Sequence, residues 1–200
     1  PDGRAPSDEE AAWMAEYVYG DNAEKMKELL DRLQARGWEE SKYNTSIQMD
    51  DPTNGFQSKL FERSKDGAIE YAYVFAGTDK NSLADLAADA GQIWGFSSQY
   101  RMAIENAKTL STELGKTELA FIGHSLGGGE AAAASMATGR LAITFNPAAV
   151  SLLTYIGEGL FLHRPNIQNH VVVGDFVNTA QILANPLLSR YFLTRLIILP

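Results

Sequence analysis

The stretch Gly123-His124-Ser125-Leu126-Gly127-Gly128-Gly129 decides the fold of this chain, because it joins two kinds of local sequence. The apolar run at 119–122 precedes it and is typical of a buried strand. The small-residue run EAAAASMA follows at 130–137 and is typical of a helix. Glycines two residues on either side of Ser125 leave room for a sharp turn. The sequence therefore predicts a strand–turn–helix unit that exposes a serine.

Downstream of this unit, short apolar runs alternate with helical segments. We expect strands at 119–122, 141–145, 171–173 and 196–199, and helices at 126–138, through 156 and at 177–183. Continuous apolar strands separated by helices are typical of a parallel sheet covered on both faces. The predicted fold class is therefore α/β, with a mostly parallel sheet.

Upstream, the pattern changes to a hairpin and helices. The runs at 55–64 and 68–75 flank the turn signal Lys65-Asp66-Gly67 and predict two antiparallel strands. Residues 38–54 are polar and predict a loop. Helices are expected at 82–94 and at 97–114, the second capped by Ser97.

The N-terminal region predicts a helical cover over the sheet. Ser7 and Glu10 form a capping-box pattern for a first helix, and Asp21 with Glu24 repeats it for a second helix that ends near Gly37. Residues 1–6 are rich in proline and glycine and are expected to be a linker from an upstream region. Residues 7–200 are expected to form one domain.

Composition excludes several kinds of chemistry. Lys plus Arg is 17 and Asp plus Glu is 25, so the net charge is −8 and the chain lacks the basic surplus of a nucleic-acid binder. The absence of cysteine excludes disulfides and thiolate catalysis. Neither a signal peptide nor a transmembrane segment is visible in these 200 residues.

The predicted turn carries a specific chemistry. A serine held on a strained strand-to-helix turn presents its Oγ as a nucleophile, which is the arrangement of the G-x-S-x-G elbow. The backbone N–H of Leu126, at the start of the helix, then faces the oxyanion that develops during acyl transfer. Ser125 and Leu126 are therefore the first candidate site residues.

At this point the sequence resembles the class 3 lipases of the α/β-hydrolase superfamily. GHSLGG follows a short apolar strand as it does in that family, and Tyr73–Asp79 with Leu83–Leu86 is similar to its Gly-Thr turn and the helix beyond it. The run Val171–Val177 is similar to the strand that ends in the triad aspartate. The resemblance implies an α/β-hydrolase fold and ester hydrolysis through an acyl-enzyme.

Further site residues are implied by the same resemblance. Thr78 matches the oxyanion-hole position, and Asp175 matches the carboxylate that orients a catalytic histidine. Segment 80–96 lies where the family carries its lid, although a buried core helix remains an alternative. The resemblance implies no cofactor and no metal.

The general base is harder to place, because the chain has three histidines and none follows Asp175. His124 neighbours the nucleophile on the turn and cannot fold back onto it. His170 lies five residues before Asp175 on the same strand, which predicts the opposite sheet edge about 17 Å away, and His163 lies in the connection before that strand. We therefore expect the base on a segment beyond Pro200.

The first four residues carry a second resemblance. Pro1-Asp2-Gly3-Arg4 is similar to the end of the Rhs core, which precedes a variable C-terminal toxin domain. This resemblance implies an antibacterial effector delivered into a target cell by its parent polypeptide and the secretion machinery. A cognate immunity protein would then be a partner.

The sequence as a whole predicts a serine ester hydrolase of the lipase or phospholipase type. Its expected substrate is a (phospho)lipid acyl ester at a membrane surface. One alternative is a general triacylglycerol or carboxyl-ester lipase that is no toxin. Another is a non-catalytic binding module with a hydrolase fold.

Overall fold

The computed structural model of this chain describes residues 5–77, 92–147, 163, 166–172 and 195–199. Within them the strands form a sheet in the order β1-β3-β4-β5-β6-β7-β8, with β2 paired to β3. The strands are β1 (Trp38–Glu40), β2 (Asp50–Asp51), β3 (Phe56–Lys65), β4 (Ala68–Phe75), β5 (Glu118–His124), β6 (Leu141–Phe145), β7 (Asn166–Val172) and β8 (Arg195–Leu199). Pairing is parallel from β4 to β8 and antiparallel at β1, β2 and β3. The predicted α/β class and mostly parallel sheet are confirmed.

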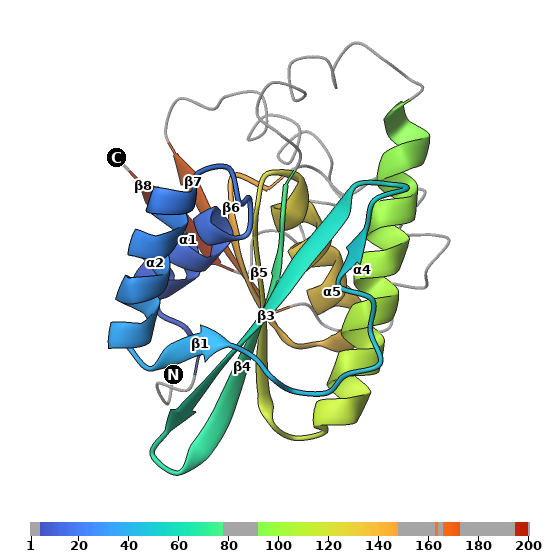
Figure 1. The fold of residues 1–200 in the computed structure, drawn as a ribbon. Coiled ribbons are helices and arrows are strands. Elements are labelled where there is room, and N and C mark those ends of the chain that lie inside the picture. The colour runs from blue at the N-terminus through green and yellow to red at the C-terminus, as the bar shows by residue number, and fades with distance from the viewer. Residues whose placement is uncertain (1–4, 78–91, 148–162, 164–165, 173–194, 200) are drawn as a thin grey trace.

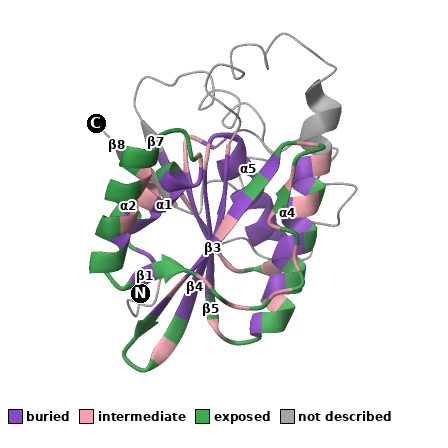
Figure 2. Ribbon diagram, in the orientation of Figure 1, coloured by how far each residue is buried: buried purple, intermediate pink, exposed green. Residues whose placement is uncertain are grey.

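Helices cover both faces of this sheet (Figure 1). On one face α1 (Asp8–Tyr17) packs on the central strands, and α2 (Ala23–Ala35) packs on α1. On the other face α5 (Leu126–Thr138) packs on β4, β5 and β6, and α4 (Gln92–Leu114) packs beside it. Figure 2 shows the difference in burial: α5 is buried along its length, whereas α2 exposes its outer side to solvent.

Strand β4 shows why the sheet needs cover on both sides. Tyr73 and Phe75 are fully buried in the core shared with α4 and α5. Val74, which points the other way, is fully buried in the core shared with α1. The apolar run at 71–76 therefore serves two cores at once, as a central strand does.

Three predicted boundaries are wrong. Helix α4 begins at Gln92, so Ser97 lies inside it and does not cap it. The expected loop at 38–54 contains β1, whose Trp38 is fully buried while the next two residues face solvent. The N-cap of α2 is Asn22, whose side chain accepts hydrogen bonds from the N–H groups of Glu24 and Lys25 at 3.0 Å each.

Strand β7 is a fourth correction. It begins at Asn166, five residues before the predicted start, because polar side chains hide the alternation of its first half. Ile167 and Asn169 are both buried, and the hydroxyl of Thr144 on β6 donates a hydrogen bond to the side-chain oxygen of Asn169. Of the helix predicted at 82–94, residues 82–91 lie outside the described residues and residues 92–94 belong to α4. The helical segment predicted to follow strand 141–145 through Ile156 is described only as far as Pro147, and the helix predicted at 177–183 lies outside the described residues.

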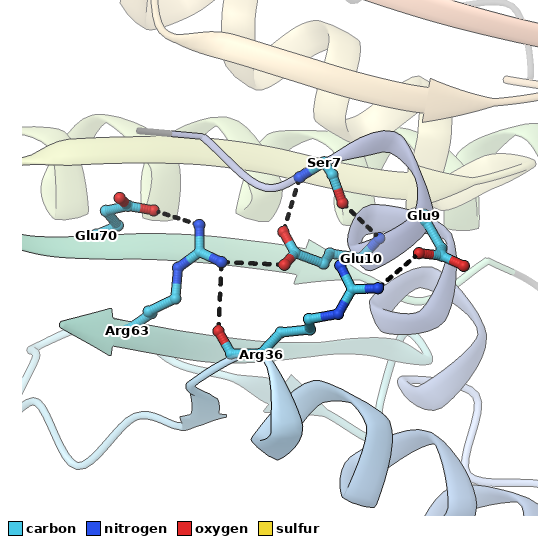
Figure 3. Close-up of polar contacts among 6 residues, drawn as sticks. All are labelled: Ser7, Glu9, Glu10, Arg36, Arg63 and Glu70. Carbon is cyan, nitrogen blue, oxygen red and sulfur yellow. Dashed lines mark hydrogen bonds and ion pairs between the residues drawn. The ribbon is translucent and has the colours of Figure 1, made fainter. Parts of the chain in front are cut away.

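Helix α1 is attached to the sheet by a buried charge cluster (Figure 3). The predicted capping box is present: Ser7 Oγ accepts from Glu10 N–H at 3.2 Å, and Glu10 Oε2 accepts from Ser7 N–H at 2.8 Å. Arg63 of β3 donates to Glu10 Oε1 at 3.0 Å and to Glu70 Oε2 at 2.8 Å. Its guanidinium also lies 4.3 Å from the centre of the Trp38 ring.

The cluster holds Glu10 in its ionised form. Burial by itself raises the pKa of Glu10, but the backbone N–H of Ser7 and the charge of Arg63 together outweigh it and lower the pKa. The three charged side chains are each at most 6% exposed. Loss of Arg63 would therefore leave two buried carboxylates without a cationic partner.

We predict that Arg63→Ala lowers the free energy of unfolding by about 3–5 kcal/mol, because it strands two buried carboxylates. Arg36→Ala is the matched control, since Arg36 pairs with Glu9 at 3.2 Å with both side chains about half exposed. That variant should lose about 1 kcal/mol or less. Urea unfolding of the three proteins measures both effects, and equal losses would contradict a structural role for the buried cluster.

Candidate active site

The centre of the site is the turn between β5 and α5. Ser125 occupies it with φ 56° and ψ −121°, a backbone conformation that glycine usually fills in type II′ turns. Its N–H donates to the Phe145 carbonyl at 3.0 Å, and its carbonyl accepts from Gly129 N–H at 3.1 Å. Bonds on both sides thus hold a strained serine at the start of a helix. Strain of this kind is concentrated at functional sites.

The flanking glycines are required by close backbone approach. A Cβ on Gly123 would lie 2.1 Å from the Gly127 carbonyl oxygen, and a Cβ on Gly127 would lie 2.3 Å from the Phe75 carbonyl oxygen. Neither obstacle is the end of a flexible side chain. The turn therefore forms only with glycine at both positions, as the sequence pattern predicted.

The electrostatics of the turn favour a developing negative charge. Leu126 is the first residue of α5, and Ser125 makes no side-chain capping bond to that helix. The first N–H groups of a helix lack partners within the helix, and its dipole is positive there. The Leu126 N–H thus lies at the positive end of α5, and its role as an oxyanion donor stays a prediction.

The end of β4 packs against the same turn. A Cβ on Gly77 would lie 2.7 Å from the carbonyl oxygen of His124. The residue after Gly77 is Thr78, the second predicted oxyanion residue, which lies outside the described residues. Asp175 also lies outside them, so its predicted role stays a prediction.

The position predicted for His170 is wrong. Because β7 begins early, His170 pairs with Phe145, which pairs in turn with His124. It therefore lies at the same sheet edge as the turn, two strands away. Its ring is nevertheless held against α1: Nε2 lies 3.2 Å from Asp8 Oδ1, and the ring stacks on Phe145 at 4.9 Å between centroids.

Of the two other histidines, His163 lies far from Ser125 and the His124 side chain contacts another residue. His163 is exposed and lies near Gly139, beyond the last residue of α5, while Ser125 precedes the first. A helix of 13 residues separates them by roughly 20 Å. His124 Nδ1 is 2.8 Å from the hydroxyl of Tyr19, a contact that sequence reasoning missed because 105 positions separate the two residues.

A cavity of about 340 Å³ opens between α1, α2 and this turn. Its walls combine apolar side chains with the polar groups of Tyr19 and His124. Charged side chains also line it, from Glu16, Asp21 and Lys25. The N-terminal helices therefore form a cavity with His124, the residue before Ser125, and Ser125 itself is not one of the lining residues.

Glu130, five residues after Ser125, is the second feature that the sequence did not reveal. It is fully buried in α5, and among the described residues neither carboxyl oxygen has a hydrogen-bond partner. Burial raises the pKa of Glu130 well above its usual range.

The described residues contain neither a cluster suited to a metal ion nor a helix suited to crossing a membrane. No group of three or more histidine, aspartate or glutamate side chains there is placed to hold a metal ion. No helix in the same ranges is both long and apolar enough to cross a bilayer.

A strained serine between a parallel strand and a helix, in a sheet covered on both faces, defines an α/β-hydrolase fold of the lipase kind. Residues 10–181 match the family model described as the Tle-like phospholipase domain. The chain belongs to this family of phospholipase and lipase ester hydrolases.

Individual relatives agree with this assignment. An extracellular phospholipase A1 of Serratia liquefaciens is 40% identical over 102 residues, which are 50% of this chain and 30% of that protein. The chain thus spans less than a third of the length of this curated relative.

Solved structures match the fold at low identity. The triacylglycerol lipase of Penicillium expansum has a TM-score of 0.53 at 14% identity, covering 92% of this chain and 74% of the lipase. The lipase of Rhizopus microsporus var. chinensis has a TM-score of 0.54 at 13% identity, covering 89% and 75%.

Two variants of Ser125 test the strain at the turn. Ser125→Ala and Ser125→Gly both remove the hydroxyl, but only glycine accepts a φ of 56° without strain. We expect the glycine variant to be more stable than the alanine variant by about 1–3 kcal/mol. Thermal and urea unfolding measure this difference, and equal stability of the two variants would show that the turn stores no strain.

Proposed function

We propose that this chain hydrolyses acyl esters of membrane phospholipids, with Ser125 as the nucleophile. The observation that carries the proposal is the strained Ser125 at the N-terminus of α5. It is flanked by Gly123 and Gly127, two positions at which only glycine fits. Membership of the Tle-like phospholipase family supports phospholipid as the substrate class.

In the proposed reaction Ser125 Oγ attacks the ester carbonyl carbon and gives up its proton to a general base. The carbonyl oxygen becomes an oxyanion, which accepts hydrogen bonds from the N–H groups of Leu126 and Thr78. Collapse releases the lysophospholipid, which takes the proton from the base, and leaves an acyl-enzyme. Water then attacks the acyl-enzyme with the same base and frees the fatty acid.

The general base and the carboxylate that orients it complete the proposed site. We assign Asp175 the role of orienting a histidine, as the lipase resemblance implies. His124, His163 and His170 are each engaged elsewhere or remote from Ser125. The proposal therefore places the catalytic histidine after Pro200 in the gene. A gene with no histidine within about thirty residues of that point would contradict this placement, because such loops are short.

Hydrolysis of phospholipid vesicles by the natural full-length protein tests the proposed activity. We expect release of fatty acid and lysophospholipid by the wild type, and a loss of at least about 1000-fold in Ser125→Ala. A triacylglycerol emulsion and a soluble short-chain ester are assayed in parallel.

Each alternative has its own outcome in that assay. Preference for the emulsion would indicate a general lipase, in line with the solved triacylglycerol lipase that shares the fold. Equal turnover by wild type and Ser125→Ala would instead support a non-catalytic binding module.

We further propose that the protein is an antibacterial effector, delivered into a target cell by a parent polypeptide. The support is the Rhs-like sequence at 1–4 and the extracellular location in the name of its Serratia relative. Secretion machinery and a cognate immunity protein are then its partners. The immunity protein is expected to block access to Ser125.

Expression directed to the periplasm of a bacterium tests the effector role. We expect lysis or growth arrest with the wild type and normal growth with Ser125→Ala at the same protein level. Co-expression of the product of the neighbouring gene should restore growth if that product is the immunity protein. Normal growth with an enzymatically active wild type would contradict the effector role and leave the hydrolase activity intact.

A further inference from the structure

Tyr19 joins the N-terminal helices to both sides of the candidate oxyanion site. It lies just after α1, and its hydroxyl is 2.8 Å from His124 Nδ1. The same hydroxyl is 3.5 Å from the backbone carbonyl oxygen of His124, and the two rings meet edge to face at 6.0 Å between centroids. The residue is therefore fixed against the turn that carries Ser125.

Its second partner is the end of β4. The backbone N–H of Gly77 donates a hydrogen bond to the Tyr19 oxygen. A Cβ on Gly77 would lie 2.3 Å from that oxygen, so only glycine allows this approach. A phenol oxygen can accept one bond while its proton is donated in another, and these two contacts use both capacities.

The hydroxyl stays protonated under all ordinary conditions. Burial raises the pKa of Tyr19 to about 12, with smaller contributions from the charges of Asp21 and Glu130. The Tyr19 oxygen is therefore a neutral hydroxyl over the whole pH range in which an ester hydrolase is assayed.

The two partners of the Tyr19 hydroxyl lie close in sequence to the proposed oxyanion donors. Gly77 directly precedes Thr78, and His124 lies two residues before Leu126. Thr78 and Leu126 are the two proposed oxyanion donors. One hydroxyl thus contacts the two backbone segments that precede the proposed donors in the sequence.

We propose that Tyr19 is a positioning residue that sets the spacing of the oxyanion hole through Gly77 and His124. The inference rests on the proposed function, because it assigns Tyr19 a part in the acyl-transfer step at Ser125. The N-terminal cover is then a working part of the active site. Donors must lie within about 2.7–3.1 Å of the oxyanion, so small displacements reduce the rate strongly.

Tyr19→Phe in the natural full-length protein is the test, because it keeps the ring and removes only the bridge. With a soluble short-chain ester we expect kcat to fall by about 10- to 100-fold while KM changes by less than about twofold. The reason is that the oxyanion exists only in the transition state and not in the bound ester.

Tyr17→Phe is the matched control. Tyr17 lies on the same helical cover and donates its hydroxyl hydrogen bond to Glu40, on β1. Its variant also loses one buried phenol contact and should show a similar change in thermal stability, but wild-type kcat. A fall in kcat of equal size in both variants would assign the effect to general loosening of the cover and overturn the inference.

A double-mutant cycle with His124→Asn tests whether Tyr19 acts through its contact with the His124 side chain. If Tyr19 acts through His124, the double variant loses no more activity than the worse single variant. Fully additive losses overturn that route. Wild-type kcat in Tyr19→Phe overturns the positioning role alone, whereas a wild type with no Ser125-dependent turnover overturns the proposed function and this inference with it.

Discussion

The close approach of three backbone segments around Ser125 is the constraint on which the rest of the structure depends. The Phe75 carbonyl, the Gly127 backbone and the Gly123 backbone come so near one another that no Cβ fits at either glycine. Strand β4 can therefore lie beside β5 only if the helix after β5 begins with almost no side chains. The buried, alanine-rich body of α5 continues that requirement along the sheet.

The N-terminal helices lie on the opposite face of the sheet and also contact this turn. Helix α1 is attached near its start by Glu10 to the buried Arg63, and Tyr19, just past its end, contacts the turn. The first attachment fixes α1 to the antiparallel strands, and the second fixes it to the parallel ones. The cover thus contacts both halves of the sheet. Residues of both α1 and α2 line the cavity beside the turn.

Local sequence patterns predicted much of this structure. The hairpin of β3 and β4, the capping box at Ser7 and the strand–turn–helix unit at Ser125 could all be predicted, because each is formed by residues that follow one another along the chain. The patterns failed where polar residues are buried by distant partners. Asn169 in β7 is buried beside Thr144, and its strand therefore had no apolar alternation to read.

The candidate site likewise combines features that the sequence predicted with features that only the structure revealed. The sequence by itself determined the need for two glycines at the turn, because a turn of this sharpness limits which residues can form it, and it predicted Ser125 as the nucleophile and Leu126 as an oxyanion donor. Only the tertiary structure decided that His170 faces Asp8, that burial raises the pKa of Glu130 and that Tyr19 reaches His124. These three facts depend on burial and on contacts between distant segments. No local pattern encodes such contacts, because they exist only once the sheet and both helical layers have assembled.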